Sequence, residues 1–62
     1  MTVEKERLAE ALAVERVHGA RAADFIGERV KALATAGDWD GVKRWMEIAG
    51  WLDRVQGPGS TH

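Results

Sequence analysis

A helix ending and a helix beginning lie back to back at Gly37 and Asp38, and this corner restricts how the chain folds. Glycine after a helical run is typical of a helix C-cap, because the left-handed backbone conformation needed there carries no Cβ clash in glycine. Asp38 is a preferred N-cap residue for the helix that follows. With so few residues between them, the two helices must double back as an antiparallel hairpin.

The rest of the sequence predicts an all-α fold, a compact three-helix up-down-up bundle. The helix-favouring residues Ala, Leu, Glu, Lys and Arg predominate through most of the chain, and the single proline, Pro58, follows them. We expect helices over about residues 3–17, 20–36 and 39–55.

The boundary between the first two predicted helices is less sharply encoded than the Gly37 corner. Thr2 is expected to cap the first helix, and Gly19 after His18 is interpreted as its C-terminal end. No Ser, Asp or Asn follows Gly19 to cap a second helix. A continuous helix through Gly19 therefore stays open as the alternative.

Apolar residues recur at helical spacing in each predicted helix and define the expected core. Ala11 and Ala22 lie on the same apolar stripes. Gly50 in the middle of the third predicted helix is unfavourable for that helix, and is interpreted either as a close approach of something to the backbone or as an unoptimised surface position. The expected core residues are Leu8, Leu12, Ile26, Val30, Leu33, Val42, Trp45, Ile48, Ala49 and Leu52.

Length and composition limit the classes of protein to consider. We assign residues 1–55 to a single helical domain and expect residues 56–62 to form a flexible tail. A chain of 62 residues buries only about 60% of its unfolded surface, so its own core is small. Very good helix packing or self-association is expected to compensate, because the sequence contains no cysteine for disulfides or thiolate metal sites.

The charge pattern argues against several kinds of partner. The net charge of −1 provides no strong field for nucleic acid or an anionic membrane. No apolar run approaches the ~20 residues of a membrane span, and the N-terminal residues are charged, unlike a signal peptide. We expect a cytoplasmic protein with no cofactor, no metal and no small-molecule substrate.

Large apolar side chains are more numerous than one small bundle is expected to cover. Trp45 falls on the expected core stripe, but other aromatic residues lie at the edges of the second and third predicted helices. Tryptophan is enriched at interface hot spots, and large exposed apolar patches usually mark interfaces. The predicted function is a non-catalytic protein–protein interaction module or small regulatory adaptor that forms a homodimer or binds another protein. The expected interface residues are Phe25, Trp39, Met46, Trp51 and Val55.

A small DNA-binding helical regulator is the first alternative, because three short helices are the usual frame of a helix-turn-helix. The third predicted helix would then read DNA through Lys43, Arg44 and Arg54. Glu47 and Asp53 interrupt this set, and Lys43 is spaced to pair with Glu47 along the helix. The balanced charge of the chain disfavours this alternative.

An enzyme with a site near His18 is the second alternative. His18 would act as a general base, with Glu15 or Glu28 orienting its ring and Arg29 nearby. No nucleophile accompanies these residues, because cysteine is absent and the only serine lies in the predicted tail. The sequence therefore predicts no catalytic residues, and His18 is interpreted as a helix-ending residue.

A combination of residues spread along the chain is typical of a known family: His18-Gly19, Ala23, Arg29, Leu33, Gly37-Asp38, Gly41, Trp45, Ile48 and Leu52. Through these residues the chain resembles a family of small bacterial helical proteins of unknown function. The resemblance covers about residues 8–55 and implies a helical fold without implying an activity. The hairpin at Gly37-Asp38 is also similar to a tetratricopeptide turn, although the chain is too short for an array of three or more such repeats.

Overall fold

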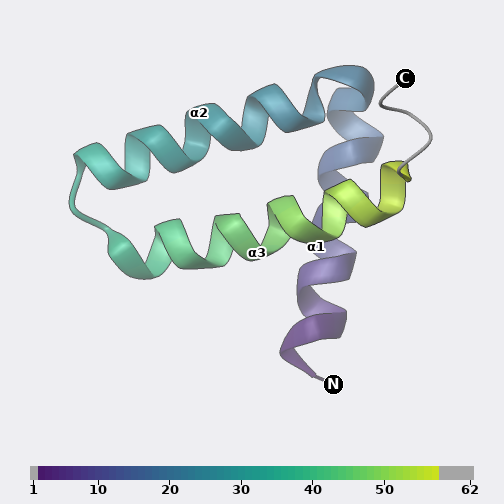
Figure 1. Ribbon diagram of the computed structural model, residues 1–62, viewed down its shortest axis with the longest axis horizontal. Helices are drawn as coiled ribbons and strands as arrows, with labels where there is room; N and C mark the ends of the chain where they lie inside the picture. Colours follow the sequence, from purple (N-terminus) through teal and green to yellow (C-terminus); the bar gives the residue numbers. More distant parts are fainter. Residues whose placement is uncertain (1, 58–62) are drawn as a thin grey trace.

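A computed structural model describes residues 2–57, and the all-α prediction is confirmed over this part of the chain. The elements are α1 (Val3–His18), the short 3-10 helix η1 (Gly19–Arg21), α2 (Ala22–Thr35) and α3 (Trp39–Gln56). Helices α2 and α3 run side by side in opposite directions, and α1 crosses behind them (Figure 1). The hairpin predicted from the Gly37 corner is therefore present.

The predicted up-down-up bundle of three helices is wrong in its first part. The described residues form two unbroken helical segments, 3–35 and 39–56, and the first changes direction at η1. Gly19 leaves the α-helical conformation with φ 56°, and Arg21 at the start of α2 provides no side-chain cap. The chain passes from α1 through η1 into α2 with no loop between them, and α1 lies across the hairpin instead of alongside it (Figure 1).

The helix ends follow from local hydrogen bonds. Thr2 accepts a bond from the Lys5 backbone N–H at 3.2 Å, which caps α1. Gly37 has φ 76°, and the Asp38 carboxylate accepts a bond from the Gly41 backbone N–H at 2.9 Å. These two residues together turn the chain from α2 into α3.

The third helix extends one residue beyond its predicted end, into residue 56 of the predicted tail. Gln56 is the last residue of α3, and its helix is followed by the C-cap Gly57, with φ 80°. The predicted tail residues 58–62 lie outside the described residues.

The core is smaller than predicted. In the part of the chain that the structure describes, the fully buried side chains belong to Ala11, Ala22, Ile26, Ile48 and Leu52. Leu12, predicted to be buried, is 46% exposed, because α1 crosses the hairpin and its buried residue is the adjacent Ala11. The other residues predicted for the core are half-buried: Leu8, Val30, Leu33, Val42, Trp45 and Ala49.

Four charged side chains connect α1 with α3, and we call them the charge cluster: Arg7, Glu10, Arg44 and Glu47. Arg7 lies 3.1 Å from Glu47 and 3.5 Å from Glu10, and Arg44 donates hydrogen bonds to Glu10. The Glu10 carboxylate raises the pKa of Arg44 above its ordinary value, first by the hydrogen bond and then by its charge. Glu47 therefore pairs with α1, and the predicted pairing of Glu47 with Lys43 is replaced.

Candidate protein-docking surface

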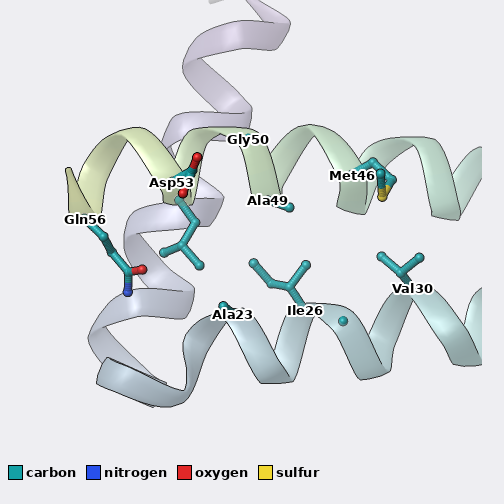
Figure 2. A pocket seen from close by; sticks show the side chains of 10 residues that line it. Ala23, Ile26, Val30, Met46, Ala49, Gly50, Asp53 and Gln56 are labelled. Atoms are coloured by element: carbon teal, nitrogen blue, oxygen red, sulfur yellow. The ribbon is translucent and has the colours of Figure 1, made fainter. Parts of the chain in front are cut away.

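An open apolar groove of about 500 Å³ lies between α2 and α3 (Figure 2). In Figure 2, α1 passes behind the hairpin, and the residues that line the groove come from α2 and α3. We call this hollow the groove. Its lining residues are Ala23, Ile26, Gly27, Val30, Met46, Ala49, Gly50, Leu52, Asp53 and Gln56.

Small residues on both helices create the groove. Ala23 and Gly27 on α2 and Ala49 and Gly50 on α3 all line it, and their side chains are too small to fill the space. A Cβ built on Gly27 or on Gly50 meets no atom within 4 Å. The packing of this protomer therefore does not require glycine at either position.

Met46 provides the large apolar side chain at the rim of the groove. It is 58% exposed, although it is unbranched and apolar. Methionine adapts its shape to a partner and is common at binding surfaces that accept helices. An exposed methionine beside a hollow of small residues is an arrangement suited to protein docking.

The predicted interface residue Phe25 makes its ring contacts within the protomer. Its ring stacks on His18 at a centroid distance of 4.0 Å and meets the Trp45 ring edge-on at 5.9 Å. Phe25 is half-buried by these contacts. The aromatic set thus fixes the junction of α1 with α2 against α3.

The other predicted interface residues lie in different environments. Trp39 is 66% exposed at the start of α3, and Met46 lies at the groove. Trp51 is half-buried, with the guanidinium of Arg54 at 5.0 Å from its ring centroid. Val55 is half-buried beside Glu15, in a separate hollow. The five predicted residues therefore do not form one continuous surface.

The residues of the enzyme alternative are not gathered around one cavity. His18 stacks on Phe25 and lines a shallow hollow with Glu28, whereas Glu15 lines a different one. The guanidinium of Arg29 lies 5.7 Å from the Trp45 ring centroid, so Arg29 stacks on an aromatic ring. Among residues 2–57, no group of three or more His, Cys, Asp or Glu side chains is placed to hold a metal ion.

The basic residues of the DNA-binding alternative have separate roles. Arg44 belongs to the charge cluster, and Arg54 covers Trp51. Lys43 is exposed on α3.

Within the described part of the chain, no helix is long and apolar enough to cross a membrane.

Sequence reasoning did not identify the groove, although one signal for it was present. Gly50 suggested a close approach to the third helix, but that Gly27 lines the same groove follows only from how α2 and α3 pack together. Two mid-helix glycines on neighbouring helices are the pattern that points to such a groove.

Comparison with known proteins identifies the family of the chain. A family model described as a family of unknown function (DUF6961) matches residues 3–57, the helical part of the chain from the start of α1 to the C-cap of α3. Comparison with curated proteins and with solved structures found no match. The chain is therefore a member of the DUF6961 family, which confirms the resemblance to a helical family of unknown function.

Proposed function

We propose that this protein is a non-catalytic protein–protein interaction module, a small adaptor of the cytoplasm, and that the groove is its docking surface. The observation that carries the proposal is the groove itself, an open apolar hollow between α2 and α3 with the exposed Met46 at its rim. Grooves of this kind accept the apolar face of an amphipathic helix.

The small residues in the groove support a helical ligand in particular. Gly27 and Gly50 leave room for the backbone of an incoming helix to approach closely. Both positions are unfavourable for their own helices relative to alanine. A partner that fills the space gives a physical reason for two glycines that the protomer's own packing does not require.

The size of the core supports the same function. Over the described residues, the fully buried side chains are two alanines, two isoleucines and one leucine. Covering the groove would bury more of Val30, Met46 and Ala49, which are still partly or largely exposed. Apolar surface removed from water stabilises the complex by about 25 cal/mol per Å². Docking is therefore expected to stabilise the fold as well as to join two chains.

Photo-crosslinking tests the proposal. A photoreactive amino acid replaces Met46 in the protein produced in its native host, and the matched control carries it at Arg16, exposed on α1. We expect a covalent protein adduct from position 46, none from position 16, and loss of the adduct when Gly50→Leu fills the groove. The proposal is wrong if position 46 gives no protein adduct, or if Gly50→Leu leaves the adduct unchanged in a folded protein.

A further inference from the structure

The exposed side of α3 carries a strip of four residues that is complementary to itself. Lys43, Met46, Gly50 and Asp53 are separated by three, four and three positions, so they follow one line along the helix. All four are exposed, and three of them border or line the groove. We call this set the α3 strip.

The strip is symmetric about Ile48. Lys43 lies five residues before Ile48 and Asp53 five residues after it, and Met46 and Gly50 lie two residues before and two after. In an antiparallel pair of α3 helices centred there, each lysine faces a carboxylate and each methionine faces a glycine. A parallel pair would instead place like charges opposite each other, which is unfavourable.

The two charges of the strip are available for such pairing. Within residues 2–57, neither Lys43 nor Asp53 forms an ion pair, whereas Arg44 and Glu47 on the other side of α3 are paired with α1. The open space above Gly50 is where a facing methionine would fit, because a Cβ built there meets nothing within 4 Å.

We infer that the occupant of the groove is a second copy of this chain, docked through antiparallel α3 helices with Lys43 facing the partner's Asp53 and Met46 facing the partner's Gly50. This inference rests on the proposed function of the groove. The contact is isologous, since the same surface serves on both copies and closes a twofold dimer. The exposed Trp39 extends the contact beyond the strip toward the other copy.

Charge-reversal variants test the register. Lys43→Glu places two carboxylates opposite each other at both ends of the dimer, and Asp53→Lys places two ammonium groups there. Each variant alone should dimerise about tenfold more weakly than the unmodified chain, or worse. An equimolar mixture of the two should form a heterodimer of nearly unmodified affinity, because both pairs then have opposite charge. Sedimentation equilibrium measures all three affinities.

The control variant is Lys5→Glu, which reverses an exposed lysine near the start of α1 and should leave dimerisation unchanged. Circular dichroism verifies that each variant remains helical. A dimer that is unaffected by both reversals, or a mixture that does not recover affinity, overturns this register. A strict monomer whose position 46 still crosslinks to another protein overturns self-docking and leaves the proposed function standing. A strict monomer without any adduct overturns both.

Discussion

The two faces of the α2–α3 hairpin differ in the contacts that their side chains make. On one face, α1 crosses the hairpin, buries Ala11 and fixes Arg44 and Glu47 through the charge cluster. On the other face, the groove is open, Met46 is exposed, and Lys43 lies unpaired among the described residues. Helix α3 therefore has two sides with groups that a neighbour could cover, and the short helix α1 covers only one of them.

Substitution of Ile48 and of Met46 should give the largest difference in unfolding free energy between the two faces. Ile48→Ala should lower the free energy of unfolding by about 2–5 kcal/mol, because it empties a fully buried site. Met46→Ala should change it by less than about 0.5 kcal/mol in the monomer, because the side chain is exposed. Urea denaturation at low protein concentration measures both. Equal losses from the two variants would mean that the faces are not distinct.

Enlarging a side chain should change the stability of the fold in opposite directions on the two faces. Ala11→Leu should destabilise the fold by about 1–3 kcal/mol, because Ala11 has no exposed surface where α1 packs on the hairpin. Gly50→Ala should stabilise the monomer by up to about 1 kcal/mol, because the new Cβ meets open space and alanine favours the helix.

Thermal denaturation of these two variants at several protein concentrations sharpens the comparison. Gly50→Ala should gain stability at low concentration and lose part of that gain at high concentration, where docking contributes. Destabilisation by Gly50→Ala at every concentration would indicate that the protomer itself requires the glycine.

The charge cluster should give the smallest effect. A double-mutant cycle with Arg7→Gln and Glu47→Gln should yield a coupling of about 0.2–1 kcal/mol, since the pair is only partly shielded from water. The coupling should decrease with added salt. A cycle of Lys5→Gln with Glu47→Gln should give none. A coupling above this range would show that the ion pairs, and not Ala11 and its neighbours, fix α1 in place.

The Gly37-Asp38 corner was predictable because its determinants are local. A C-cap glycine and an N-cap aspartate act on backbone groups within a few residues, so the sequence alone predicts the hairpin. The path of α1 was not predictable in this way. Gly19 indicates where α1 ends, but the direction that the chain takes after it depends on which side chains of α1 meet α3.

The partners of the charged and aromatic residues depend on that path. Glu47 is spaced for Lys43 on its own helix, yet Arg7 lies closer in space once α1 crosses α3. From its spacing, Phe25 is predicted to lie at the edge of an apolar stripe. In the structure the His18 ring stacks on it, because η1 brings the end of α1 close to α2. The groove likewise depends on the register of two helices and not on either helix alone.

The most direct test of the open face is a concentration series followed by NMR. Protein labelled at the methionine methyl groups reports on the groove through Met46, and the indole N–H of Trp51 reports on the side of α3 away from it. We predict that the Met46 signal shifts with concentration, that the Trp51 signal shifts much less, and that Gly50→Leu abolishes the Met46 shift. A Met46 signal that stays constant over the whole series would contradict docking of two copies through the groove.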